Sequence, residues 1–198
     1  MTAVMPVSAS GSTSHTLLQR VQQHEPAAWR RFANLYTPLV LRWCATGGLH
    51  SHDAADVTQD VFQAVFHGIA RFQRNSAGQT LRGWLWTITR NKICDHFRRR
   101  RDEPVAVGGT ATFNPAIDVP AADPEPMDQV AAELTHRALA LMQTDFEPAT
   151  WQAFWGTAVD GLPAKVVAEN LGLTPTAVYT AKSRVLNRLR CELEGLLE

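Results

Sequence analysis

The segment LRGWLWTITRNKICDHFRRRR, from Leu81 to Arg101, combines aromatic rings with positive charge in a pattern that suits a nucleic-acid ligand. Between positions 82 and 101, seven basic residues (82, 90, 92 and 98–101) accompany one acidic residue, Asp95. Bases stack on aromatic rings while cations hold the phosphate backbone, so this mixture fits single-stranded nucleic acid. An alternative stays open for Trp84 and Trp86, because both rings could be core residues while only the arginine run contacts a ligand.

A second candidate nucleic-acid element lies between positions 163 and 190, where the sequence predicts two helices joined by a tight turn. Gly172 can adopt the left-handed conformation that such a turn needs, Thr174 is a good N-cap, and Pro175 suits the first helical position. A helix-turn-helix of this kind places its second helix in the DNA major groove. The cations at 182, 184, 188 and 190 would contact phosphates. The outer face of the second helix carries polar side chains at Thr176, Tyr179, Thr180, Ser183, Arg184 and Asn187.

The segment SHDAADVTQDVFQAVFHGIARF predicts an amphipathic helix with one acidic face. Its apolar residues repeat at helical spacing and predict a buried face made of Val57, Val61, Phe62, Val65, Phe66 and Ile69. The opposite face carries Asp56, Gln59, Asp60 and Gln63 at the spacing i, i+3, i+4, i+7. Asp53 and Asp56 stand in the first turn, where the helix dipole favours negative charge. Spacing alone indicates no more than a solvated face.

The composition excludes several classes of protein. The chain has 198 residues, zero formal net charge and three cysteines without a CxxC pair. We therefore expect neither a disulfide framework nor a bound metal or other cofactor. Motifs for a phosphate loop or a catalytic nucleophile are missing, so we expect no enzyme. We expect a cytoplasmic protein, because the start resembles no signal peptide and no apolar run reaches the ~18 residues that span a membrane.

The order of these segments predicts an all-α chain of two small helical bundles joined by a flexible acidic linker. We expect a disordered arm at 1–14, a first domain at 15–101, a linker at 102–128 and a helix-turn-helix domain at 129–198. The linker holds six acidic residues, five prolines and no basic residue, a composition that favours an extended chain. It is either a passive spacer, or its charge lies along a basic channel of a partner or competes with DNA for the arginines before it.

Together the three segments resemble a known family. HDAADVTQDVFQAVF, LRGWLWTITRNKICDHFRRRR and GLPAKVVAENLGLTPTAVYTAKSRVLNRLR resemble the acidic helix, the −10-reading helix and the −35-reading helix-turn-helix of bacterial RNA polymerase sigma factors of the extracytoplasmic-function type, in the family's order. The resemblance implies a transcription initiation factor that reads both promoter elements and aids strand opening. It implies core RNA polymerase and promoter DNA as partners, duplex at −35 and single-stranded at −10. It also implies an anti-sigma protein as a further partner. We expect a monomer that binds no membrane.

The resemblance also implies three sets of site residues. Asp56, Gln59 and Asp60 match the positions that dock on polymerase, and the expected set is Asp53, Asp56, Gln59, Asp60 and Gln63. The loop 73–80 matches the loop that captures a flipped base. The expected −10 set is Arg74, Asn75, Ser76, Trp84, Trp86, Arg90, Asn91, Lys92, Asp95, His96, Arg98, Arg99, Arg100 and Arg101. The expected −35 set is Thr174, Pro175, Thr176, Ala177, Tyr179, Thr180, Lys182, Ser183, Arg184 and Arg188.

Two departures from the family pattern affect these expectations. Ala55 stands where an acidic residue is usual in the docking helix. The usual basic triplet of the recognition helix is replaced by Tyr179, Thr180 and Ala181, so the −35 sequence that is read could be unusual. The alternative function is an independent helix-turn-helix regulator that binds DNA without polymerase. Such regulators usually dimerise, and the sequence offers no dedicated dimerisation helix.

Overall fold

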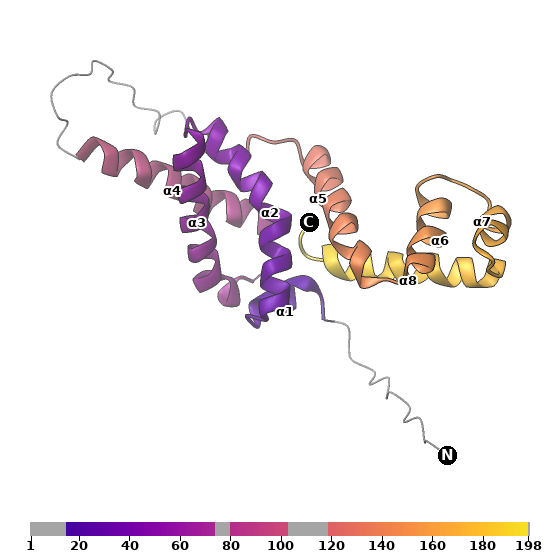
Figure 1. Cartoon of the computed structure of the whole chain (residues 1–198). Helices are drawn as coiled ribbons and strands as arrows, with labels where there is room; N and C mark the ends of the chain where they lie inside the picture. Colours follow the sequence, from indigo (N-terminus) through magenta and orange to yellow (C-terminus); the bar gives the residue numbers. More distant parts are fainter. Residues whose placement is uncertain (1–14, 74–79, 103–118, 198) are drawn as a thin grey trace.

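The computed structural model describes residues 15–73, 80–102 and 119–197, and every regular element within those ranges is a helix (Figure 1). The all-α prediction is therefore confirmed. The expected N-terminal arm, 1–14, lies outside the described residues. None of the described helices combines the length and the apolar character needed to cross a lipid bilayer.

The N-terminal half, residues 15–102, is built on a long central helix. Its elements are α1 (Leu17–Gln22), α2 (Pro26–Thr46), α3 (Ser51–Gly68), the 3-10 turn η1 (Ile69–Arg71) and α4 (Leu81–Asp102). The sequence predicts a helix break near Pro26 and a helix end at Gly47-Gly48, and α2 begins at Pro26 and is capped by Gly47. Helix α2 contacts both α3 and α4 and contributes three fully buried rings, Phe32, Tyr36 and Trp43. This ring-rich core fixes α3 and α4, the helices that carry the acidic face and the arginine run.

The C-terminal half, residues 119–197, contains the predicted helix-turn-helix. Its elements are α5 (Met127–Met142), the 3-10 turn η3 (Gln143–Asp145), α6 (Pro148–Ala158), α7 (Ala164–Leu171) and α8 (Pro175–Leu193). Gly172 ends α7 in the left-handed conformation, at φ +64°. The Thr174 hydroxyl then caps α8 by accepting the Ala177 N–H at 3.2 Å. Local rules of turn and cap chemistry therefore place this turn correctly.

The sequence pattern also predicts a buried face on the last helix, made of Val178, Val185, Leu186, Leu189 and Leu193, and two of the predicted buried positions are wrong. Phe66 is 37% exposed and Leu186 is 40% exposed. Helix α8 packs through Val178, Ala181 and Val185, and Leu186 lies one residue off that stripe. Phe66 lies at the edge of the α3 face, where its ring contacts Trp29 at a centroid distance of 5.0 Å. In both cases, helical spacing identified the correct buried face of the helix, but it did not identify which residues at the edge of that face are exposed.

One hydrophobic cluster spans both halves. Val130, Leu134 and Ala138 of α5 belong to the same buried cluster as the side chains of α1 and α2. Helix α5 lies beside α2, and the end of α8 approaches α1 (Figure 1). The Tyr36 hydroxyl, fully buried, donates a hydrogen bond of 2.9 Å to the Leu196 carbonyl. In this structure α5 and the end of α8 therefore pack on the N-terminal half, whereas α6 and α7 pack with α8 in separate hydrophobic clusters.

Candidate nucleic-acid interface

The two tryptophans of α4 have different environments. Trp86 is 3% exposed and meets Trp43 edge-on at a centroid distance of 5.3 Å. Its indole N–H points at the Ala121 carbonyl, 3.4 Å away. Trp84 is half-buried and lies against Phe72 at 5.2 Å. In this conformation Trp86 is covered on both sides, so its ring cannot stack on a base.

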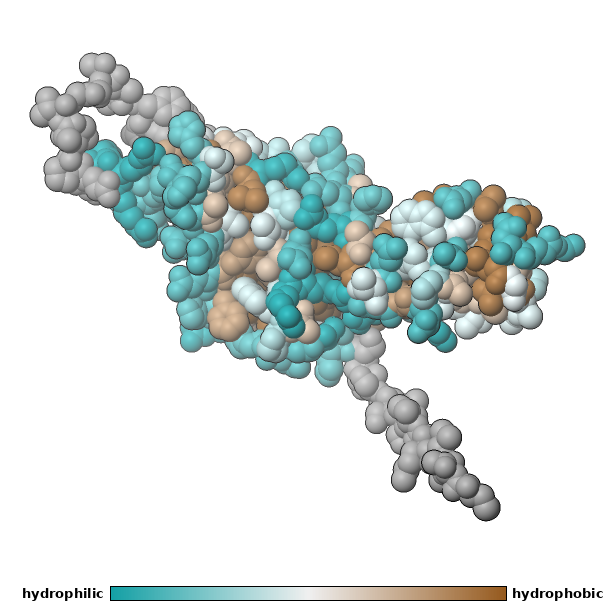
Figure 2. All heavy atoms as spheres, in the orientation of Figure 1, coloured by the Kyte–Doolittle hydropathy of each residue, from teal (hydrophilic) through white to brown (hydrophobic). Residues whose placement is uncertain are grey.

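The distal part of α4 presents most of the expected −10 residues to solvent. The side chains of Asn91 and Arg98–Arg101 are exposed, and those of Lys92, Asp95 and His96 are half-buried. This end of α4 is hydrophilic in the space-filling view (Figure 2). Arg98 pairs with Asp95 at 3.2 Å within the helix. The exposed amide and guanidinium groups supply donors for phosphate and base edges.

The start of α4 is fixed by a local cap, whereas the base-capture loop is not described. The Thr80 hydroxyl accepts the Gly83 N–H at 3.0 Å. The expected residues Arg74, Asn75 and Ser76 lie outside the described residues.

The acidic face of α3 contacts the arginine run of α4. Asp53 lies 3.1 Å from Arg100 and 3.7 Å from His96. The latter distance is too long for a hydrogen bond, and the buried Nε2 atom of His96 has no hydrogen-bond partner in the part of the chain that the structure describes. Asp60 lies 3.9 Å from Arg99. Two acidic residues of the expected polymerase-binding set therefore lie against basic residues of the expected −10 set. Helical spacing alone had indicated only a solvated face.

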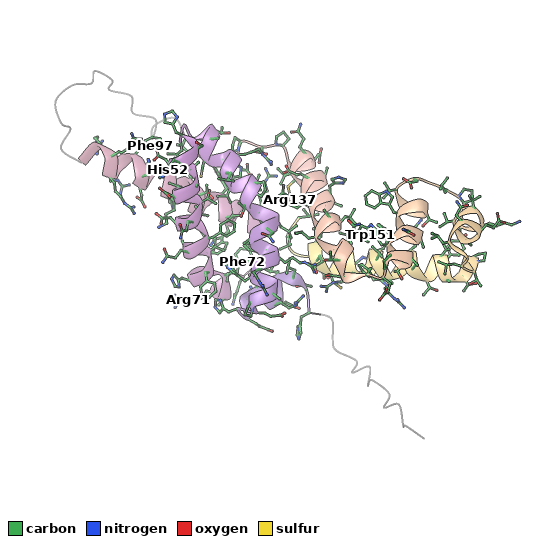
Figure 3. All side chains as sticks on the ribbon, viewed as in Figure 1. His52, Arg71, Phe72, Phe97, Arg137 and Trp151 are labelled. Carbon is green, nitrogen blue, oxygen red and sulfur yellow. The ribbon has the colours of Figure 1, made fainter. Side chains whose placement is uncertain are left out.

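The remaining residues of the acidic set face solvent. Asp56, Gln59 and Gln63 are exposed, and Asp56 lies 3.4 Å from His52 one turn earlier. Figure 3 shows Phe97 near the start of α3 and Phe72 near its other end. The exposed side chains of Asp56, Gln59 and Gln63 are therefore accessible to a partner in this structure.

Helix α8 keeps most of its expected −35 residues accessible. Tyr179 is 62% exposed, and Pro175, Thr176, Thr180, Ser183 and Arg184 are also exposed. Lys182 departs from this pattern, because its ammonium group donates to the Thr157 carbonyl at 3.4 Å. Arg188 departs further, with an ion pair of 2.7 Å to Glu192. The exposed members of the expected −35 set therefore lie in the first three turns of α8, by the helical repeat of about 3.6 residues.

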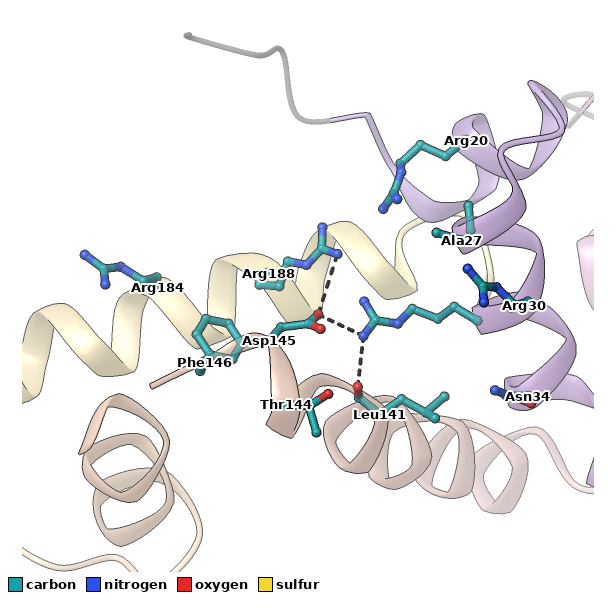
Figure 4. A pocket seen from close by; sticks show the side chains of 12 residues that line it. Arg20, Ala27, Arg30, Asn34, Leu141, Thr144, Asp145, Phe146, Arg184 and Arg188 are labelled. Atoms are coloured by element: carbon teal, nitrogen blue, oxygen red, sulfur yellow. Dashed lines mark hydrogen bonds and ion pairs between the residues drawn. The ribbon is translucent and has the colours of Figure 1, made fainter. Parts of the chain in front are cut away.

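An ion network joins Arg188 to the N-terminal half (Figure 4). Arg31 of α2 contacts Asp145 at 2.8 Å, Glu192 at 2.9 Å and the Leu141 carbonyl at 2.9 Å. Arg188 lies 3.9 Å from Asp145. These residues surround a pocket of about 880 Å³ between α2 and α8. Sequence reasoning did not find this network, because its partners are up to 161 positions apart.

The end of the acidic linker makes a second contact that sequence reasoning did not find. Asp123 accepts hydrogen bonds from the Arg82 guanidinium and, at 3.0 Å, from the Trp43 indole. Glu125 pairs with Arg42 at 2.9 Å, and this pairing raises the pKa of Arg42 above its ordinary value. Arg82, one of the seven basic residues counted in this segment but not a member of the expected −10 set, is 6% exposed. The linker thus binds arginines of α2 and α4, not the run at 98–101, in the part of it that the structure describes.

Comparison with known proteins bears on both helical halves. A family model for sigma-70 region 2 matches residues 32–103. RNA polymerase sigma factor CnrH of Cupriavidus metallidurans is 30% identical over 153 residues, which cover 76% of each chain. The sigma factors BldN of Streptomyces coelicolor and SigE of Mycolicibacterium smegmatis are 26% and 31% identical, over 87% and 86% of this chain. The alignments span 63% of BldN and 62% of SigE.

Proposed function

Because the chain belongs to the extracytoplasmic-function sigma factors of the sigma-70 family, we propose that it binds core RNA polymerase and directs it to promoters with particular −35 and −10 sequences. The observation that carries this proposal is the presence of two separate polar faces in one chain, on α8 and on distal α4. Each face is small, so affinity for either DNA element alone is weak. Polymerase supplies avidity by holding both contacts at once. The protein itself catalyses no reaction.

The acidic face of α3 is the proposed docking surface for polymerase. Asp56, Gln59 and Gln63 are exposed. Asp60 is weakly held, at 3.9 Å from Arg99. Asp53 has a different role, because its carboxylate is half-buried against Arg100. It orients the arginine run rather than meeting the partner directly.

Helix α8 is the proposed reader of −35 duplex DNA. The N-terminal end of a recognition helix carries the residues that contact base edges. Here that end carries Thr176, Tyr179, Thr180 and Ser183, which are exposed, with Arg184 placed to contact phosphate. Tyr179 is a large aromatic residue where the family pattern has a cation. It favours a contact with a thymine methyl group or with the sugar–phosphate backbone over a bidentate contact with guanine.

The distal half of α4 and the loop before it are the proposed site of −10 strand capture. Asn91, Arg98 and the following arginines offer exposed donors along about three helical turns. Extruding a base costs a few kcal/mol, so strand opening and −10 specificity could arise in one event. We assign residues 15–102 to this task and residues 129–197 to −35 reading. An anti-sigma protein stays a prediction of the family resemblance.

Promoter selection from a library randomised at −35 and −10 tests the proposal. The protein is incubated with purified core RNA polymerase, and bound DNA is sequenced against samples that lack one component. We expect two enriched blocks that require both protein and polymerase. Tyr179→Ala is expected to change only the upstream block, and Asn91→Ala only the downstream block. Enrichment of a single palindromic site without polymerase would instead identify an independent regulator.

A further inference from the structure

Residues 119–126, named here the acidic strap, have no regular secondary structure and contact both α2 and α4. The strap begins at Val119, which is 4% exposed, and leads into α5. Residues 120–122, 124 and 126 are exposed, so Val119 is its one buried apolar residue. Its attachment therefore depends on hydrogen bonds and charge, which a competing polyanion can replace, rather than on a hydrophobic core.

Two carboxylates attach the strap to the N-terminal half. Asp123 accepts from the Trp43 indole at 3.0 Å and from Arg82, whose side chain is 8% exposed. Asp123 also makes a hydrogen bond within the strap, since its carboxylate accepts the Glu125 N–H at 3.0 Å. Glu125 forms a bidentate pair with Arg42, and its carbonyl accepts from Arg82. Hydrogen bonds to charged groups are the stronger class in proteins.

The strap covers one side of α4 and leaves another side open. The Ala121 carbonyl lies 3.4 Å from the Trp86 indole nitrogen, and the Val119 carbonyl lies 3.4 Å from Arg90 Nε. Trp86 and Arg90 follow Arg82 at intervals of four residues, so all three share one stripe of the helix. Asn91 lies on a different side of α4 and is exposed. A nucleic acid could therefore reach the open side first.

We propose that the acidic strap is an intramolecular latch that occupies part of the −10 face in the free protein and must leave before α4 can bind single-stranded DNA in full. The strap presents two features of a nucleic-acid strand, namely negative charge and oxygen acceptors on a segment of chain that lies along α4. Its seat presents what a strand needs, namely arginines beside indole rings. This proposal rests on the proposed function, because it assigns the −10 face to α4.

Release of the strap leaves the other contacts between the halves in place, because α5 packs on α2 and Arg31 pairs with Glu192 without any residue of the strap. The latch is therefore a local equilibrium at the surface of α4, and a ligand that binds only the strap-released state must shift it.

The test compares the affinity of three full-length proteins for a fluorescein-labelled single-stranded DNA of mixed sequence, measured by fluorescence anisotropy. They are the wild type, Asp123→Asn/Glu125→Gln, and the control Asp128→Asn/Glu147→Gln. Both variants lose two negative charges, but Asp128 and Glu147 are exposed and lie outside the strap contacts. We expect the strap variant to bind the single-stranded DNA about tenfold more tightly than the control, because the strap no longer covers part of the −10 face of α4. Adding Trp86→Phe to the strap variant should remove most of this gain.

Acrylamide quenching of tryptophan fluorescence reports the latch without DNA. We expect quenching to rise in the strap variant, and this rise to shrink in the Trp86→Phe background. If neither quenching nor DNA affinity differs from the control, the latch is refuted while the proposed function stands. If quenching rises but DNA affinity does not, the strap moves without masking a DNA site. That result overturns the proposal and removes Trp86 and Arg90 from the −10 face.

Discussion

Replacing Arg31 with alanine should weaken the contact between the two halves of the protein and so lower its free energy of unfolding. Arg31 donates to Glu192 at 2.9 Å, to the Leu141 carbonyl at 2.9 Å and to Asp145 at 2.8 Å. Glu192 is 1% exposed, and its Oε2 atom has no hydrogen-bond partner among the described residues. In the variant, Arg188 at 2.7 Å would still pair with this buried carboxylate, but the hydrogen bond from Arg31 would be lost.

The magnitude follows from the exposure of each partner. Hydrogen bonds to buried charged groups contribute about 1.5–3 kcal/mol, and exposed ion pairs about 0.2–1 kcal/mol. Asp145, at 35% exposed, belongs nearer the second class. We therefore expect Arg31→Ala to lower the free energy of unfolding by roughly 2–4 kcal/mol. Urea unfolding of the full chain, followed by circular dichroism, measures this loss.

Arg30→Ala is the matched control, because Arg30 lies on the same helix, is exposed and makes one bond of 3.4 Å to the Pro26 carbonyl. Its effect should stay within about 0.5 kcal/mol. Equal unfolding free energies for the two variants would contradict the reasoning, because they would show that the halves do not meet through this network in solution.

Three further predictions concern single residues. Thr174→Ala removes the cap on Ala177 N–H and should cost about 1 kcal/mol in unfolding free energy and weaken binding to −35 duplex DNA in a holoenzyme gel-shift assay. Gly47→Ala would place a methyl group 3.0 Å from the buried Ile93 side chain and should cost roughly 1–3 kcal/mol in urea unfolding. Burial raises the pKa of the Cys44 thiol from 9.0 to about 11. The unfolded thiol then ionises first, so stability falls as pH rises from 9 towards 11, and Cys44→Ala should reduce this fall in urea titrations. A slope in Cys44→Ala equal to that of the wild type would contradict the assignment.

Local chemistry allowed much of the fold to be predicted from the sequence. The helix-turn-helix depends on Gly172, Thr174 and Pro175, whose conformational preferences act within a few residues of chain. Likewise Pro26 begins α2 where the prediction expected a break. The edges of buried faces were less predictable, as Leu186 shows, since they depend on which neighbouring helix covers them.

The contacts that close the molecule could not be predicted, because each joins distant parts of the chain. Arg82 and Asp123 are 41 positions apart, and Arg31 and Glu192 are 161 positions apart. Arg82 lies in a strongly basic segment, which indicates a cation that contacts a ligand, although its side chain is buried in the structure. Trp86 similarly has an interior environment that depends on Trp43 and on the strap. Charge and aromatic content indicate a type of surface, whereas packing decides which of its residues are accessible.

Transcription in vitro tests the central claim most directly. Purified core RNA polymerase is supplied with a promoter selected from the randomised library and with wild-type protein, Asp56→Arg/Asp60→Arg, or the control Asp128→Arg/Asp160→Arg. Asp128 and Asp160 are exposed acidic residues outside the proposed docking face. The account predicts a specific transcript that requires the protein, persists with the control and is lost with the docking variant. DNA selection without polymerase and without any transcript would contradict it.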